Sequence, residues 1–214
     1  MSAPPELREL IARDLAPARP LPPPSTRALA LVPIAAAVVA AVPLLHELRP
    51  DLPAIGALRA FGFSIAQAIA GMFVVAAALR ESVPGRQWTA GQLSALLAGG
   101  LALPAILPGF AASAFDVAPR AQGAAVIAVA CFRTSALAAL PALAAASVLS
   151  ARAFPLRPAV AGALYGLGCG LIADAGLRLW CEFSAPSHVL VAHVGAVILS
   201  MAVGVAAALV SRRR

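Results

Sequence analysis

Long apolar runs separated by short polar segments dominate the pattern of the chain. At about 1.5 Å of rise per residue, helices of this kind cross a hydrocarbon core of about 30 Å. The third run is the shortest and contains Pro104. The pattern predicts an all-α integral membrane protein, built as a bundle of six transmembrane helices. The six runs cover residues 28–45, 55–79, 91–106, 132–149, 158–179 and 189–210.

A further apolar stretch, residues 121–130, ends at Cys131 just before the fourth run. Two structures fit this stretch: a helix lying in the membrane interface, or an extension of the fourth span. We expect the interfacial helix.

The composition supports a membrane protein and argues against a soluble enzyme. Hydrophobic residues make up 61% of the 214 positions and charged residues only 12%, and the mean hydropathy is +0.90. Soluble domains are about 45–50% apolar even when glycine is counted. We expect a proline-rich cytoplasmic tail over residues 1–27, a transmembrane domain over 28–210 and a basic cytoplasmic C-terminus over 211–214, with no enzymatic activity.

All 16 basic residues are arginines, and the net charge is +7. They lie mainly at the edges of the apolar runs and form no stripe that would neutralise phosphates, so we expect no nucleic-acid binding. Placing the N-terminus in the cytoplasm leaves most arginines inside, as the positive-inside rule requires, and both termini are then cytoplasmic. The arginines expected outside are Arg49, Arg59, Arg120, Arg133 and Arg178.

The tail contains one amphipathic segment followed by a proline-rich one. The apolar residues Leu7, Leu10, Ile11 and Leu15 recur at the spacing of one helix face. So short a helix is marginal in water, and it needs either the membrane surface or the groove of a partner protein. The following prolines, in APARPLPPPSTR, predict a stiff extended spacer. A spacer holds the helix away from the bilayer, which favours the partner protein.

The predicted topology gathers a polar cluster at the outer ends of the last three spans. Cys131 and Cys181 are its thiols, and Glu182, His188 and His193 are possible accessory ligands. Thiolate, imidazole and carboxylate bind zinc, copper or cadmium, and two thiols in an oxidising compartment can instead form a disulfide. The spacing matches no known metal motif. Buried packing of the cysteines and interfacial hydrogen bonding of the histidines remain the structural alternatives.

The fifth run combines small residues with a single carboxylate. Gly162, Gly166 and Gly170 form a small-residue face for close helix packing, and we expect Cys169 beside them to be a packing residue. Asp174 is the acidic residue well inside a span, where an ionisable group is by default a candidate for function. We expect it to form an intramembrane ion pair with Arg178, one turn away, and with Arg133 at a matching depth on the fourth span.

These segments resemble a known family. The tail LIARDLAPARPLPPPSTR, the loop FPLRPAVAGALYG, the segment WCEFSAPSHVLVAH and Cys131 are similar to the NrsF-like negative regulators of sigma F, which are six-span anti-sigma factors of the bacterial inner membrane. The likeness covers essentially the whole chain. It implies that the tail sequesters an extracytoplasmic-function sigma factor, and that Cys131 and Cys181 sense a heavy metal or an oxidant.

The resemblance implies a signal rather than an obligatory cofactor, and that signal includes a soft divalent metal ion. We expect its binding to shift the last three spans relative to one another and to release the sigma factor. Two other functions stay open. A small-molecule or metal-ion transporter would need Asp174 and not the tail, and a membrane thiol oxidoreductase would cycle Cys131 and Cys181 with a quinone or a partner thiol.

Overall fold

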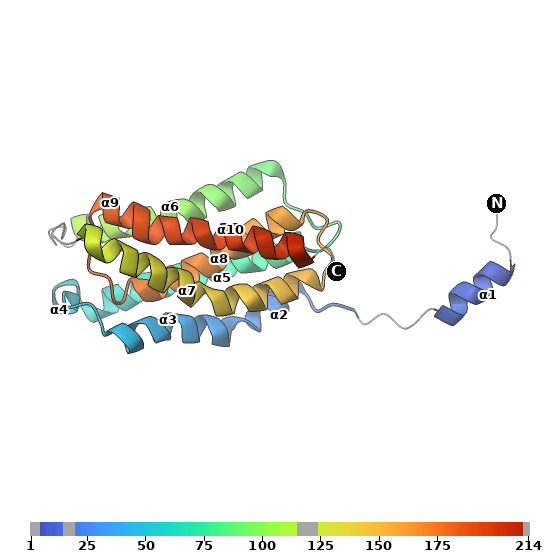
Figure 1. Cartoon of the computed structure of the whole chain (residues 1–214), viewed down its shortest axis with the longest axis horizontal. Helices are drawn as coiled ribbons and strands as arrows, with labels where there is room; N and C mark the ends of the chain where they lie inside the picture. The colour runs from blue at the N-terminus through green and yellow to red at the C-terminus, as the bar shows by residue number, and fades with distance from the viewer. Residues whose placement is uncertain (1–4, 15–19, 115–123, 212–214) are drawn as a thin grey trace.

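A computed structural model describes residues 5–14, 20–114 and 124–211, and every regular element within these ranges is helical (Figure 1). Six segments are long and apolar enough to cross a membrane, which confirms the number of long apolar helices that the sequence predicts. The elements are α1 (Pro5–Asp14), α2 (Pro24–Leu29), α3 (Val32–His46), α4 (Leu52–Ile55), α5 (Ala57–Glu81), α6 (Ala90–Ala114), α7 (Ala124–Ala151), α8 (Pro158–Leu177), α9 (Pro186–His188), the π-helical segment η1 (Val189–Val194) and α10 (Gly195–Ser211).

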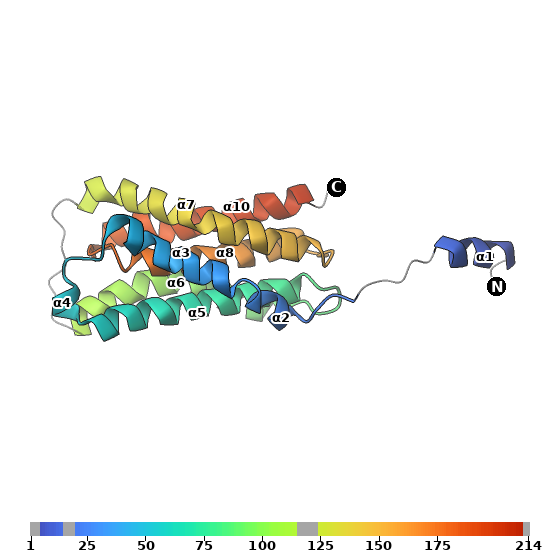
Figure 2. The same ribbon diagram turned by 90° about the horizontal axis from the view of Figure 1, so that it is seen from below.

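The bundle has two ends that matter for function. Figure 1 shows α2 and the end of α10 at one end, which we call the tail end, and α9 at the other, which we call the site end. In Figures 1 and 2, α1 lies apart from the bundle, beyond the tail end. Helix α1 and the end of α10 therefore lie on the same side of the bundle, as an even number of long helices requires.

Helix α8 is the central element of the bundle. Of its most apolar window 89% is buried inside the protein, compared with 44% or less for the other five long segments. Its glycines explain how the neighbours approach so closely. A Cβ added at Gly162 or Gly166 would lie 2.5 Å from a backbone oxygen of α10, and one added at Gly170 would lie 3.1 Å from Val197 Cα on the same helix. The predicted small-residue face is thus the face that α10 covers.

Three boundaries differ from those predicted. Helix α7 begins at Ala124 and continues unbroken past Cys131, so the expectation of a separate interfacial helix over 121–130 is wrong, and residues 121–123 lie outside the described ranges. No proline or glycine interrupts the chain between Ala124 and Cys131, and alanine is a strong helix former. Helix α6 runs to Ala114 through Pro104 and Pro108, since an apolar bundle tolerates proline within a long helix.

The first span begins earlier than predicted, within the proline-rich segment. Pro24 is the first residue of α2, where its fixed backbone angle and missing N–H suit a helix start. The chain turns at Ala30 and Leu31 before α3, because Pro33 has no N–H with which to continue the ladder. Arg27 on α2 is buried at 4% exposure and donates a hydrogen bond to the carbonyl of Leu149 near the end of α7.

The crossing of α5 and α8 offers a test of this packing. A Cβ on Gly168 would lie 2.6 Å from the carbonyl oxygen of Gly71, whereas one on Gly62 of α5 would meet no atom within 4 Å. We expect Gly168→Ala to lower the free energy of unfolding by about 1–3 kcal/mol, as overpacked cores do. Gly62→Ala is the matched control and should cost nothing. Unfolding in detergent micelles measures both, and equal stability of the two variants would contradict the packing.

Candidate functional site

Two thiols and one imidazole meet at the site end of the bundle. Cys131 comes from α7, Cys181 from the segment after α8, and His188 is the last residue of α9. One potential ligand atom of each lies within 4.8 Å of the others, and Cys181 Sγ is 3.2 Å from His188 Nε2. Both thiols are free and buried. The structure thus brings together three of the five cluster residues predicted from the sequence.

The π-helical segment η1 places the remaining histidine on the same side. In an α-helix of 3.6 residues per turn, residues five apart point in different directions. In a π-helix the backbone hydrogen bonds join residues i and i+5, so side chains five positions apart lie on nearly the same side of the helix. His188 immediately precedes η1 and His193 lies within it, and their ring centroids are 5.6 Å apart. The wide turn is therefore what directs both imidazoles toward the cysteines.

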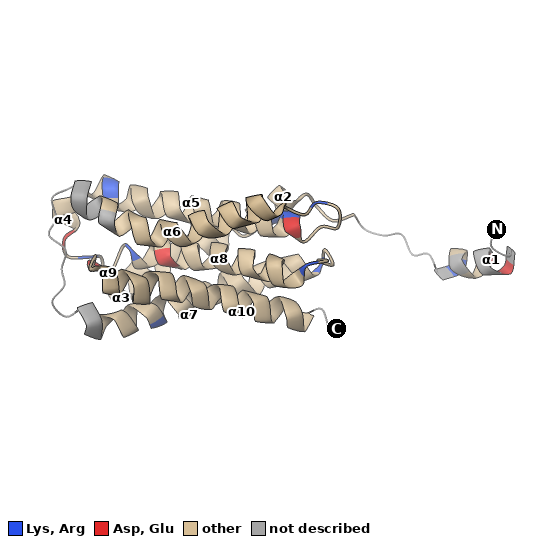
Figure 3. Cartoon of the chain, turned by 90° about the horizontal axis from the view of Figure 1, so that it is seen from above, with Lys and Arg blue, Asp and Glu red and all other residues tan. Residues whose placement is uncertain are grey.

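A buried polar network extends from His193 into the core. Asp174, which is fully buried in α8, accepts a hydrogen bond from His193 Nδ1 at 2.6 Å and lies 3.4 Å from the guanidinium of Arg178. The other carboxylate oxygen of Asp174 accepts a hydrogen bond from Gln67 Nε2 of α5 at 2.7 Å. Arg178 donates in turn to Gln67 Oε1 and to the carbonyl of Pro104 in α6. One carboxylate therefore joins α5, α8 and η1, and Arg178 adds α6. In Figure 3 the red band within α8 marks an acidic residue, and Asp174 is the acidic residue of that helix.

One of the two predicted partners of Asp174 is confirmed and the other is wrong. Arg178 forms the ion pair, but Arg133 is exposed and lines a groove with Ala41, His46 and Trp180 on the α3 side of α7. Arg133 lies at a depth similar to that of Asp174 but does not pair with it, because the side chain of Arg133 projects away from α8. The sequence analysis missed Gln67 and the His193 contact. The available signal was that Gln67 is the single amide side chain in the apolar run 55–79.

Cys181 lies in an environment that favours its thiolate. The hydrogen bond with Cys131 lowers the pKa of Cys181, and the neighbouring imidazoles add to this effect, while burial opposes it. A thiolate is the form that reacts with oxidants and binds metal ions. Cys181 is therefore the more readily ionised thiol of the buried pair, and Cys131 lies within reach of the same ligand.

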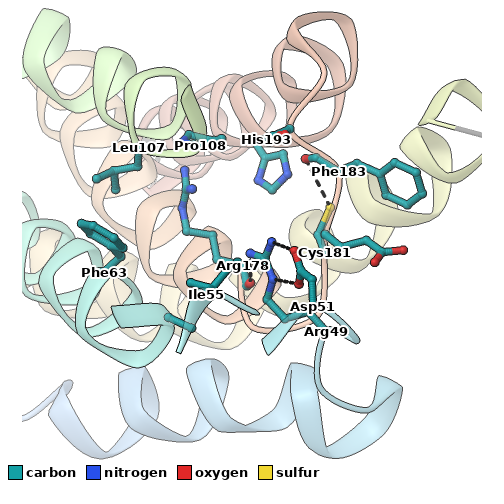
Figure 4. Close-up of a pocket in the computed structure, with 13 residues that line it drawn as sticks. Arg49, Asp51, Ile55, Phe63, Leu107, Pro108, Arg178, Cys181, Phe183 and His193 are labelled. Atoms are coloured by element: carbon teal, nitrogen blue, oxygen red, sulfur yellow. Dashed lines mark hydrogen bonds and ion pairs between the residues drawn. The ribbon is translucent and has the colours of Figure 1, made fainter. Parts of the chain in front are cut away.

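A small cavity leads to the site. It has a volume of about 50 Å³, and its wall includes Cys181, His193, Arg178, Arg49 and Asp51 (Figure 4). Arg49 and Asp51 form an ion pair at 2.5 Å. Glu182 lines the same cavity but does not belong to the trio of close ligand atoms. A volume of this size admits a water molecule or a single ion.

The remaining predicted residues lie elsewhere. Cys169 is buried within α8 among apolar neighbours, in the main core and away from the cysteine pair, in the position expected of a packing residue. Leu7, Leu10 and Ile11 belong to α1, and Leu10 is 60% exposed. Leu15 lies outside the described residues.

The fold and the site together define a class: a helical bundle with six helices long and apolar enough to cross a membrane, a thiol cluster at one end and a separate helical tail at the other. Within that class, a family model described as negative regulator of sigma F (NrsF) matches residues 11–213, and the chain belongs to this family. The family is regulatory, and its description implies a sigma factor as partner. No curated protein and no solved structure matches the chain.

Proposed function

We propose that this protein is a membrane anti-sigma factor that sequesters an extracytoplasmic-function sigma factor through its N-terminal tail and releases it when Cys131 and Cys181 meet a heavy metal or an oxidant. The tail would face the cytoplasm and the cysteines the periplasm of a bacterial inner membrane. Family membership supports the sigma factor as partner. The free helix α1 beyond the tail end supports the tail as the element that binds it.

The observation that carries the proposal is the placement of α7. This helix holds Cys131 near the site end, and its Leu149 carbonyl accepts the hydrogen bond from Arg27 of α2 at the tail end. The two positions are 18 residues apart, which corresponds to about 27 Å along the axis. Arg27 lies directly after the tail, so one helix connects the thiol site with the base of the tail.

The site geometry supplies a reason for that helix to move. Ligand atoms around a tetrahedral zinc ion lie about 3.3–3.8 Å apart for metal–sulfur and metal–nitrogen bonds of about 2.3 and 2.0 Å. The three atoms here lie within 4.8 Å of one another, and Cys181 Sγ and His188 Nε2 are already 3.2 Å apart. The two thiols are free, and a disulfide would bring their sulfurs to about 2.0 Å. Oxidation would draw Cys131 toward Cys181, and a bound metal ion would set the spacing of Cys131, Cys181 and His188, so that either event would displace α7 relative to α8 and α9.

The energies are compatible with such a switch. Moving a two-state equilibrium from 1:99 to 99:1 requires about 5.5 kcal/mol of differential affinity. Structural zinc sites bind with apparent free energies of about 10–16 kcal/mol in small peptides. A fraction of that amount, available only in the contracted state, is sufficient to shift the bundle and release the partner.

Co-purification tests the proposal directly. The full chain and a variant lacking residues 2–19 are expressed in the native host with a C-terminal affinity tag and extracted in mild detergent. We expect a sigma factor to accompany the full chain and to be absent from the shortened one, since α1 is removed. The deletion ends before α2, so Pro24 and Arg27 keep their places in the bundle.

The control is a variant with Leu10→Ala alone, which retains the tail and the spacer and should retain a reduced amount of sigma factor. Equal recovery of the sigma factor with the shortened chain would contradict the role of the tail. Absence of any sigma factor from the full chain would contradict the function itself.

A further inference from the structure

His193 presents a buried nitrogen that has no partner among the described residues. Its Nδ1 is bound to Asp174, while its Nε2 is buried and lacks a hydrogen bond. The whole residue is only 2% exposed. Buried polar atoms in native structures nearly always have a hydrogen-bond partner, so an unsatisfied one points to a further partner such as a water or an ion.

The orientation of this nitrogen matches that of a metal ligand. In the neutral imidazole, donation from Nδ1–H to a carboxylate leaves the lone pair on Nε2, and the carboxylate–histidine–metal arrangement is the usual second shell of zinc sites. His193 also interacts with Cys181, and both residues line the same cavity. Figure 4 shows the imidazole of His193 directed into that cavity beside Cys181.

His188 supplies the other imidazole. Its Nε2 is 3.2 Å from Cys181 Sγ, within the trio that includes Cys131. The π-helical turn holds His188 and His193 with ring centroids 5.6 Å apart, so both rings lie on the side of the thiols. The trio thus offers two sulfurs and one nitrogen within 4.8 Å of one another, and His193 adds a second imidazole beside Cys181, outside that group of close atoms.

We propose that Cys131, Cys181, His188 and His193 form a four-coordinate site for a soft or borderline divalent cation, and that Asp174 acts as a positioning residue for His193. The inference rests on the proposed sensing by the two cysteines and adds the histidines as the other half of the site. Two thiolates balance the charge of a divalent ion, and any proton still on either sulfur leaves as that sulfur binds. Two sulfurs with two imidazole nitrogens suit Zn²⁺ or Cd²⁺ in tetrahedral geometry.

The site also explains the wide turn in the helix. Single π-helical turns within α-helices occur often at functional sites. Here the segment lies where His193 must face both Asp174 and Cys181. Regular α-helical geometry from His188 onward would direct the two histidines apart, leaving the cation with two thiols and one imidazole.

Cadmium binding to the purified full chain in detergent, under reducing conditions, tests the inference. The wild type should bind one Cd²⁺ per chain, with a thiolate-to-cadmium absorption band in the ultraviolet. His193→Gln and His188→Gln should each weaken binding by at least tenfold and should move the ¹¹³Cd resonance, because a nitrogen leaves the coordination sphere. His46→Gln is the matched control: His46 stacks on Trp180 at 4.5 Å, outside the trio, and its loss should leave both readouts unchanged.

The outcomes separate the inference from the proposed function. Unchanged cadmium affinity and an unchanged ¹¹³Cd resonance in both histidine variants would overturn the four-ligand site, whereas sensing by the cysteines alone would stand if cadmium still released the sigma factor from the full chain. Thermal unfolding of each variant without metal shows whether the bundle is intact. If one histidine variant unfolds, the other decides the result.

Discussion

A chain carrying serine at both Cys131 and Cys181 is expected to hold its sigma factor as the wild type does and to release none of it on exposure to cadmium or a thiol oxidant. Serine occupies nearly the same volume as cysteine, so the buried pair keeps its packing at the site end. A hydroxyl forms no disulfide and binds soft cations poorly, so the contraction that would displace α7 does not occur. A reporter gene behind a promoter dependent on the sigma factor measures the induction curve, which should become flat.

Cys169→Ala is the matched control for this experiment. Cys169 lies in the main core of α8, away from the site trio, and its removal should leave the induction curve unchanged. Mass spectrometry after alkylation shows whether oxidant joins Cys131 to Cys181 in the wild type. Normal induction in the double serine variant would contradict sensing by these thiols, while the anti-sigma function would still rest on the tail.

The sequence predicted the parts of this protein that depend on periodicity and composition. Apolar runs of about twenty residues gave the six long helices, and the repeat of Gly162, Gly166 and Gly170 gave the face that α10 covers. The meeting of Cys131 with Cys181 also followed from the topology, because adjacent spans end at the same side. These features depend on the lengths of the apolar runs and on the spacing of residues along the chain, both of which can be read from the sequence.

The contacts of Asp174 depend on which way each helix faces, and the sequence did not determine that. Arg133 and Gln67 both lie on neighbouring spans, yet only Gln67 projects toward α8. The close approach of His188 and His193 needs a π-helical turn, and no residue pattern in VLVAHV predicts such a turn. Helix rotation and local register thus decide the composition of the site, and both arise from packing of the whole bundle.

Removing the carboxylate of Asp174 should be among the most destabilising single changes in the bundle. Asp174→Ala leaves the guanidinium of Arg178 with Gln67 and the carbonyl of Pro104 but without its paired carboxylate, and leaves His193 Nδ1 without its acceptor. Breaking a buried ion pair from one side costs about 3–5 kcal/mol, because the remaining charge stays buried and uncompensated. Unfolding in mixed detergent micelles should show a loss of that size.

Two further variants separate the uncompensated charge from the loss of packing. Asp174→Leu combined with Arg178→Met removes both charges and fills similar volume, so it should recover much of the stability, as hydrophobic replacements of buried ion pairs do. Asp51→Ala breaks the half-buried pair with Arg49 in the cavity wall and should cost about 1 kcal/mol or less, since partly solvated pairs contribute little. If Asp174→Ala cost no more than Asp51→Ala, the carboxylate would not be what joins α5, α8 and η1, and another contact would have to hold His193 in place beside the thiols.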